Sequence, residues 1–196
     1  MMQFKPPGSI TFLLLTMLFL ATACQSTPPA DEVAAGSAEP ITAEKADVPG
    51  VRNFTQVGPN TGFGGATQPS AMPILKEKGF ATVINLRLES ESDTGFADSR
   101  AAAEAAGLEY VHLPFDTSDM DPQLIPDFLA TVDDPARQPV YVHCGSATRV
   151  AALWMIKRVQ EDGWTIEQAS REAEAIAGKP PQAIAFAENY LSSVKQ

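Results

Sequence analysis

Residues 139–150 read PVYVHCGSATRV and decide the fold of this chain of 196 residues. The β-branched run 139–143 leads into a turn of small residues, and the apolar segment 149–162 that follows has the composition of a buried helix. The sequence therefore predicts a buried strand, a tight loop that begins at Cys144, and a helix that packs back against the strand.

Strands and helices are predicted to alternate over the rest of the chain. Two further β-branched runs, 81–86 and 109–113, lack strict alternation and suit a sheet that is covered on both faces. The predicted helices are 69–78, 94–106, 122–133, 149–162, 166–177 and 181–194. Strands that alternate with helices in this order form a parallel sheet with right-handed crossovers. The predicted fold class is α/β, with a parallel-centred sheet flanked by helices.

Local signals add detail at three places. Asp121 is a predicted N-cap for the helix that follows it, and Thr165 with Gln168 matches the capping-box pattern. The glycine-rich segment 62–65 lies in no strand–helix unit of the dinucleotide-binding type, and it is predicted to be a tight turn.

The N-terminal 23 residues are predicted to be an export signal. A lysine precedes the uncharged run 10–23, which is shorter than the ~20 residues of a membrane-spanning helix. The run ends in small residues before Cys24, as in the lipobox of bacterial lipoproteins, and this resemblance implies that Cys24 is lipidated. Ala21 stands where that pattern usually has Leu, so ordinary cleavage before Cys24 is the alternative. Gln25, in place of Asp, favours the outer membrane of a bacterial cell envelope, on the periplasmic side.

Residues 24–50 are predicted to be a flexible tether. The stretch 25–50 has four Pro, five acidic residues and no aromatic residue, so it cannot bury enough surface to offset the entropy lost on ordering. The predicted folded domain is 51–196, which is a normal length for one hydrophobic core. The tether and the lipid anchor would together hold this domain at a membrane.

The composition argues against several classes of function. The net charge of −10 offers no basic surface for nucleic acid, and it disfavours polyanionic substrates by repulsion. Two His and two Cys are scattered along the chain, so no metal site is expected, and two Cys cannot form a disulfide framework. No cofactor is predicted.

The chemistry is expected at one edge of the sheet. The carboxyl ends of parallel strands meet there, and the loops after the three predicted strands begin at Arg87, Pro114 and Cys144. Small residues after Cys144 can turn backbone N–H groups inward and form an anion-binding nest at a helix N-terminus. The helix dipole and the Arg149 guanidinium favour the thiolate form of Cys144, and the guanidinium can hold an oxyanion through two hydrogen bonds. A nucleophile and an anion clamp are therefore predicted to face one pocket.

The stretch from His143 to Arg149 resembles the His-Cys-x5-Arg signature of the protein tyrosine and dual-specificity phosphatases. Segments 64–70, 78–80, 83–87 and 107–114 resemble the bacterial Blh-type phosphatase-like domain, which is named for a beta-lactamase hydrolase-like protein. This resemblance covers about residues 53–162. It implies a tyrosine-phosphatase-like fold and hydrolysis of phosphate monoesters through a phosphocysteine, without a metal. It implies that Cys144 is the nucleophile, that Arg149 binds the phosphate, and that the loop amides bind it too: Gly145, Ser146, Ala147 and Thr148.

The loop departs from the phosphatase signature in two ways. Four residues instead of five separate Cys144 from Arg149, which removes one inward amide and tightens the ring around the anion. Val150 stands where phosphatases commonly carry a Ser or Thr whose hydroxyl helps the thiolate leave, and Thr148 is a partial substitute. Shorter loops of this kind resemble those of rhodanese-type sulfurtransferases, although the Blh-type group also has the shorter spacing.

The resemblance further implies an aspartic general acid on a loop about thirty residues before the cysteine. Asp116, 28 residues before Cys144, is the best match, and Asp119 is the second. His143 is predicted to orient the cysteine loop by hydrogen bonding, and a satisfied core histidine is the alternative.

Three functions stay open at this stage. The chain is a phosphatase acting on a phosphate ester, a sulfurtransferase that carries a persulfide on Cys144, or a catalytically silent module that binds a small oxyanion. Three charged residues near the active edge, Arg87, Glu89 and Glu91, are predicted to form an ion-pair cluster at the surface.

Overall fold

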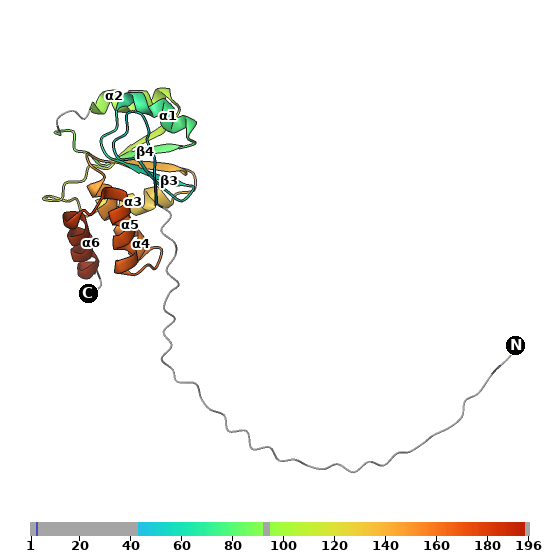
Figure 1. Cartoon of the computed structure of the whole chain (residues 1–196), viewed down its shortest axis with the longest axis vertical. Coiled ribbons are helices and arrows are strands. Elements are labelled where there is room, and N and C mark those ends of the chain that lie inside the picture. The colour runs from blue at the N-terminus through green and yellow to red at the C-terminus, as the bar shows by residue number, and fades with distance from the viewer. Residues whose placement is uncertain (1–2, 4–42, 92–94, 195–196) are drawn as a thin grey trace, which may run out of the picture. The chain divides into compact units, whose positions relative to one another are not determined.

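Four parallel strands form the centre of the fold in the computed structural model, which describes residues 3, 43–91 and 95–194 (Figure 1). Three of them lie where the sequence predicts strands, and all four residues of β4 and of β6 are buried, as expected for a sheet covered on both faces. Their order in the sheet is β3 (Thr61–Gly64), β6 (Val140–His143), β4 (Thr82–Asn85) and β5 (Glu109–His112). The predicted α/β class and its parallel centre are confirmed.

Two short strands extend this sheet and make it mixed, which the sequence did not predict. β1 (Ala43–Lys45) pairs antiparallel with β2 (Thr55–Val57), and β2 pairs antiparallel with β3. The Lys45 ammonium fastens this edge, because it donates at 2.7 Å to Thr55 Oγ1 and at 2.7 Å to the Ile176 carbonyl. The folded region therefore begins before the predicted boundary at residue 51, and the end of the predicted tether belongs to the sheet.

The glycines at 62–65 are not the predicted tight turn, because Gly62 and Gly64 lie within the central strand β3. A Cβ atom at Gly62 would stand 2.4 Å from Phe80 Cζ, and a Cβ atom at Gly64 would stand 2.0 Å from the Tyr141 hydroxyl oxygen. The two glycines leave room for aromatic rings that pack across the strand.

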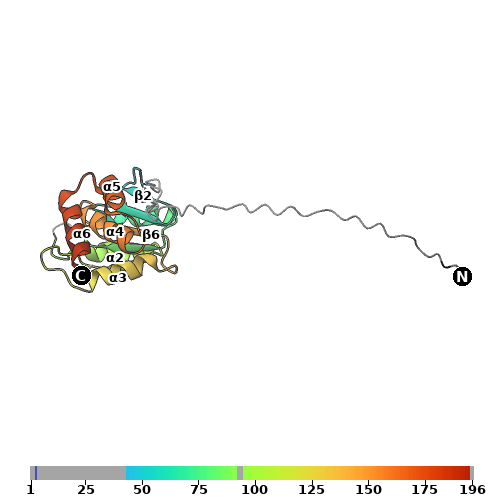
Figure 2. The same ribbon diagram turned by 90° about the horizontal axis from the view of Figure 1, so that it is seen from below.

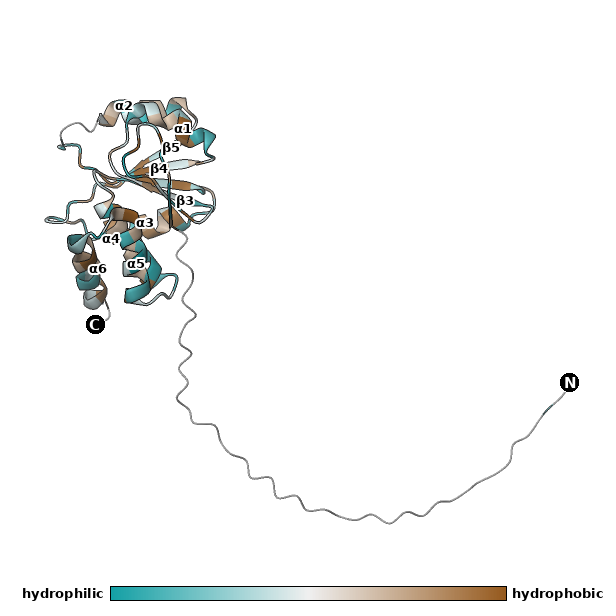
Figure 3. Ribbon diagram, viewed as in Figure 1, coloured by the Kyte–Doolittle hydropathy of each residue, from teal (hydrophilic) through white to brown (hydrophobic). Residues whose placement is uncertain are grey.

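Two layers of helices cover the two faces of the sheet (Figure 1). α1 (Met72–Glu77), preceded by a 3-10 turn at Pro69–Ala71, and α2 (Phe96–Ala105) lie on one face. The other face carries α3 (Leu124–Asp133), α4 (Thr148–Gln160), α5 (Ile166–Ala177) and α6 (Pro181–Val194). Seen from below, these four helices lie together (Figure 2). These helices differ in hydropathy, since α3 is largely hydrophobic and α5 is largely polar (Figure 3).

Helix α4 lies at the centre of its layer, in contact with α3, α5 and α6. Eight consecutive residues, from Val150 to Lys157, are buried, so the helix that follows the cysteine loop is held on every side. The predicted capping box of α5 is confirmed, since the Thr165 hydroxyl accepts from the Gln168 amide at 3.2 Å and the Thr165 amide donates to Gln168 Oε1 at 2.9 Å. Asp121 instead forms a turn before α3, in which its carboxylate accepts from the Gln123 amide at 2.8 Å.

Within the described ranges, no helix is both long enough and apolar enough to cross a bilayer. Apart from residue 3, the predicted signal lies outside the described residues, and so do the lipidation residue Cys24 and the tether as far as residue 42.

Candidate active site

The cysteine loop connects β6 to α4 at the carboxyl edge of the parallel strands, as predicted. The Cys144 amide donates to the Gly64 carbonyl at 3.3 Å, and the Ala66 amide donates to the Gly145 carbonyl at 2.9 Å. The bond from Ala66 ties the Gly145 carbonyl of the cysteine loop to the segment that follows β3. Gly65 permits this approach, because a Cβ atom there would stand 3.0 Å from the Gly145 carbonyl oxygen.

The loop turns into α4 through a left-handed residue. Ala147 has φ 71° and ψ 1° and is fully buried, so packing holds an alanine in a conformation that favours glycine. No side chain caps the start of α4 and its first turn contains no acidic residue, so the amide groups there stay available to an anion. This backbone is that of an anion-binding nest.

Hydroxyl groups lie on the loop itself and not at the position after Arg149. Val150 is fully buried in the core and supplies no polar group. Ser146 Oγ and Thr148 Oγ1 lie 2.9 Å apart and hydrogen-bond to each other. Any hydroxyl that assists chemistry at this loop therefore comes from Ser146 or Thr148.

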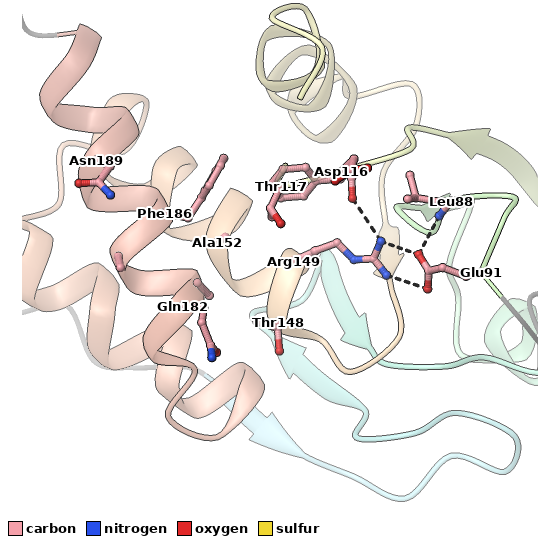
Figure 4. Close-up of a pocket in the computed structure, with 13 residues that line it drawn as sticks. Leu88, Glu91, Asp116, Thr117, Thr148, Arg149, Ala152, Gln182, Phe186 and Asn189 are labelled. Carbon is pink, nitrogen blue, oxygen red and sulfur yellow. Dashed lines mark hydrogen bonds and ion pairs between the residues drawn. The ribbon is translucent and has the colours of Figure 1, made fainter. Parts of the chain in front are cut away.

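Glu91 holds the Arg149 guanidinium through two hydrogen bonds, of 2.6 Å from Nη1 to Oε1 and 3.0 Å from Nη2 to Oε2 (Figure 4). Nη1 also donates to the carbonyls of Leu86 and Phe115, each at 3.2 Å. Arg87 Nε donates to Glu91 Oε2 at 3.0 Å. Arg149 is therefore fixed by three segments that end at the same edge of the sheet.

This arrangement corrects the prediction that Glu91 belongs only to an ion-pair cluster at the surface. Burial by itself would raise the pKa of Glu91, but hydrogen bonds from Arg149, the Leu88 amide and Arg87 lower that pKa to about 2. The carboxylate is thus charged at neutral pH and fixes an arginine of the site. The available sequence signal was its position four residues after Arg87, in the loop that follows β4.

Cys144 and Arg149 are brought together, as the sequence predicts. Cys144 is 1% exposed, and it forms no disulfide within the described residues. Burial acts to lower the pKa of Arg149, but hydrogen bonding to Glu91 and the charge and hydrogen bonding of Cys144 together raise it. The guanidinium is therefore a permanent positive charge that interacts with both Cys144 and Glu91.

Asp116 lies at the same site, on the loop after β5, but its carboxylate is engaged elsewhere. It accepts from the Ser118 amide at 2.9 Å and from the Ser118 hydroxyl at 2.7 Å, and these two bonds lower its pKa. Asp116 is therefore ionised at neutral pH in this conformation, whereas a general acid must carry a proton. Its predicted role requires the contacts with Ser118 to be released.

His143 is buried behind the loop, and its ring stacks on Tyr141 with centroids 5.8 Å apart. Among the described residues, neither ring nitrogen has a hydrogen-bond partner of normal geometry, so the structure does not show the predicted hydrogen bond to the cysteine loop. Burial lowers the pKa of His143 to about 4, against a smaller opposing effect of the Cys144 and Gly65 backbone. The ring is therefore neutral at physiological pH.

A cavity of about 680 Å³ opens beside these residues, between the 115–117 loop and α6 (Figure 4). Thr148, Arg149 and Asp116 lie at one end of it, and side chains of α6 form the opposite wall. The sequence did not predict this cavity, because nothing local in 181–194 indicates which face of the helix meets the site. In the ranges the structure covers, no group of three or more His, Cys, Asp or Glu side chains is placed to hold a metal ion.

The comparison with protein families gives a match over more than half of the chain. The model of the phosphatase-like domain of beta-lactamase hydrolase-like proteins matches residues 53–161. The chain belongs to this family. The matched region contains the cysteine loop, Arg149, Glu91 and Asp116, but it ends before α5 and α6. A comparison with curated protein sequences found no match.

Solved structures share the fold. TpbA from P. aeruginosa has a TM-score of 0.62 and 18% identity, over 80% of this chain and 92% of that chain. A DUF442 protein from Shewanella putrefaciens CN-32 has a TM-score of 0.60 and 23% identity, over 74% and 92%. The catalytic core of the PP-IP phosphatase SIW14 from S. cerevisiae has a TM-score of 0.59 and 17% identity, over 76% and 96%. At these identities the likeness shows the fold, and it confirms the predicted phosphatase-like fold.

Proposed function

We propose that this protein is a cysteine-dependent phosphatase that hydrolyses phosphate monoesters. The observation that carries the proposal is the Arg149 guanidinium, held by Glu91 beside the Cys144 sulfur at the uncapped start of α4. Family membership supports it. So do two similar structures, TpbA bound to pTyr and SIW14 bound to citrate, whose ligands are anionic.

In the first step the Cys144 sulfur attacks phosphorus, and a sulfur–phosphorus bond forms as the ester phosphorus–oxygen bond breaks. Arg149 and the loop amides bind the non-bridging oxygens, where negative charge must be held through the transition state. Asp116, once protonated and free of Ser118, gives its proton to the leaving alcohol.

In the second step water attacks phosphorus, the sulfur–phosphorus bond breaks, and phosphate leaves. Asp116 takes the proton from the attacking water, and the sulfur departs as a thiolate. This scheme uses groups of the protein only.

Steady-state hydrolysis of an aryl phosphate by the full chain tests the proposal. Cys144→Ser and Arg149→Ala should each abolish turnover, and vanadate should inhibit the unmodified protein. Arg171→Ala is the matched control, because Arg171 is an exposed arginine of α5 whose ion pair is with Glu167. EDTA-resistant turnover that survives Cys144→Ser would exclude the phosphocysteine scheme.

The four-residue spacing from Cys144 to Arg149 favours sulfur transfer as a second candidate. Here the Cys144 sulfur attacks the outer sulfur of thiosulfate, the sulfur–sulfur bond of thiosulfate breaks, and sulfite leaves, so that Cys144 becomes a persulfide. Intact-mass analysis separates the candidates, because a phosphate ester adds a phosphoryl group and thiosulfate adds one sulfur atom. Tight phosphate binding with neither adduct would indicate a silent anion-binding module.

The cellular site is part of the same proposal. The signal-like residues 1–23, followed by Cys24 in a lipobox-like context, support export and lipid anchoring at the periplasmic side of a bacterial outer membrane. Expression in a bacterium fed with labelled palmitate should label the protein in the membrane fraction. Cys24→Ser should remove the label, and a soluble, unlabelled parent protein would contradict the anchor.

A further inference from the structure

The cavity beside Arg149 has two apolar walls. Phe115 and Leu88 contribute to the side next to the catalytic loop, and Ala183, Ala185 and Phe186 of α6 contribute to the opposite side. α6 lies outside the region matched by the family model, so family membership does not predict this wall. The cavity is continuous with the site that would hold the phosphate, because Thr148 and Arg149 line it too.

The charges of the lining restrict what the cavity can bind. Among the described residues that line it, Arg149 is the single cation, and it is already paired with Glu91. Glu91 and Asp116 are acidic, and the other polar side chains, among them Gln182 and Asn189, are neutral. One phosphate group can bind at Arg149, whereas a second phosphate would lie among carboxylates and uncharged groups. The lining therefore disfavours any further negative charge on the part of the ligand beyond its phosphate.

Phe186 indicates the shape of the part of the ligand that lies beyond the phosphate. Its ring is partly exposed and meets the buried Phe115 ring edge-on, with centroids 5.2 Å apart and an interplanar angle of 62°. This contact fixes Phe186 in place, and its remaining surface faces the cavity, where it can stack on a flat ligand. A cavity of roughly 150 Å³ is enough for benzene, so the volume of about 680 Å³ accommodates more than one ring.

We infer that this cavity binds the alcohol portion of a phosphate monoester, and that this portion is uncharged, aromatic and larger than one ring. Phe186 stacks on it, and Ala185 sets its length. The inference rests on the proposed phosphatase activity for the reaction, but binding in the cavity does not need turnover. It excludes substrates with several phosphates, although the fold is shared with a PP-IP phosphatase.

Three esters and three variants of the full chain, one of them a control, test the inference. Phenyl phosphate and 2-naphthyl phosphate release alcohols of similar acidity, so a difference between them reports binding in the cavity. We expect kcat/KM to be roughly tenfold higher for the naphthyl ester, mostly through KM, and lowest for a hexose bisphosphate. Ala185→Phe fills the cavity and should bring the naphthyl-to-phenyl ratio to about one. Phe186→Ala should lower the ratio severalfold, and Ser192→Phe, at an exposed position of α6 that does not line the cavity, should leave it unchanged.

A second measurement separates the failure of this inference from the failure of the proposed function. The Cys144→Ser protein is titrated calorimetrically with naphthylmethyl phosphonate and with methyl phosphonate. The naphthyl compound should bind more tightly than the methyl compound, and the double variant Cys144→Ser, Ala185→Phe should lose this difference in affinity. That result supports the cavity assignment even if no ester is turned over. Equal binding of both compounds, or turnover with the same ratio in every variant, overturns the assignment and leaves the phosphatase proposal intact.

Discussion

The buried imidazole of His143 should make the protein lose stability between pH 6.5 and pH 4. In the unfolded chain the ring gains a proton near its ordinary pKa of 6.5, but in the folded protein burial delays this to a pKa of about 4. Over that window the unfolded state binds more protons than the folded state, so the free energy of unfolding falls as the pH falls. Each pH unit is worth about 1.4 kcal/mol, so the loss amounts to about 3 kcal/mol.

The assay is urea denaturation at several pH values from 7.5 to 4.5, which covers most of the window and ends at the ordinary pKa of Glu91, 4.5. The slope of the free energy of unfolding against pH is compared between the unmodified protein and His143→Gln. The absolute values are not compared, because His143→Gln is expected to lower the free energy of unfolding at every pH. The unmodified protein should lose about 3 kcal/mol towards the acid end, and His143→Gln should remove most of this slope.

The chain has two histidines, so His112→Gln is the natural control. The His112 ring is only partly buried and lies 2.7 Å from the Arg87 carbonyl oxygen. If His143→Gln does not fold, the proton signals of the two rings in the unmodified protein give the same information by titration. A His143 midpoint near 6.5, or equal slopes in the parent and His143→Gln, would refute the reasoning.

The remaining predictions concern three carboxylates. Glu91→Gln removes the charge that holds Arg149, so kcat/KM for an aryl phosphate should fall about tenfold, the effect of losing about 1.4 kcal/mol of positioning; unchanged activity would contradict that role. Ser118→Ala removes the hydroxyl bond that contributes most to the lowered pKa of Asp116 and keeps the amide bond, so the alkaline limb of the pH–rate profile should move to higher pH, and an unmoved limb would assign the general acid elsewhere. Glu172→Ala removes a fully buried carboxylate that accepts from Trp154 Nε1 at 2.7 Å. The free energy of unfolding, measured by denaturation, should fall by about 1–3 kcal/mol, because the buried Trp154 N–H loses its acceptor, whereas Arg158 keeps its ion pair with Asp162.

The parts of the fold that the sequence predicted depend on local signals. The strand at 139–143 and the helix after it follow from β-branched runs and helical apolar spacing, and α5 follows from a capping box contained within four residues. Each of these patterns is complete within one segment, so it requires no knowledge of what packs against it.

The parts that it missed depend on partners far along the chain. The edge strands β1 and β2 are fastened by Lys45 to Ile176, 131 residues away, and the glycines of β3 are needed because of Phe80 and Tyr141. Glu91 is 58 residues from Arg149, and no spacing rule joins them. The sequence predicted Cys144 and Arg149 as the central pair of the site but not Glu91, which holds Arg149 in position, because a contact between distant segments has no local signal.

The neutral His143 and the buried Val150 bear on how the shortened loop works. Since His143 carries no charge at physiological pH and Val150 carries no hydroxyl, the side chains available to assist the sulfur are Arg149 and the bonded pair Ser146 and Thr148. Arg149 cannot be replaced by its neighbours, because it is the one cation lining the cavity among the described residues. Ser146 and Thr148 hydrogen-bond to each other at 2.9 Å, so one of the two hydroxyl protons is used within the pair and the other hydroxyl can donate elsewhere. A loop built in this way concentrates its positive charge in Arg149, and this is why the position of that one guanidinium depends on a carboxylate outside the loop, that of Glu91.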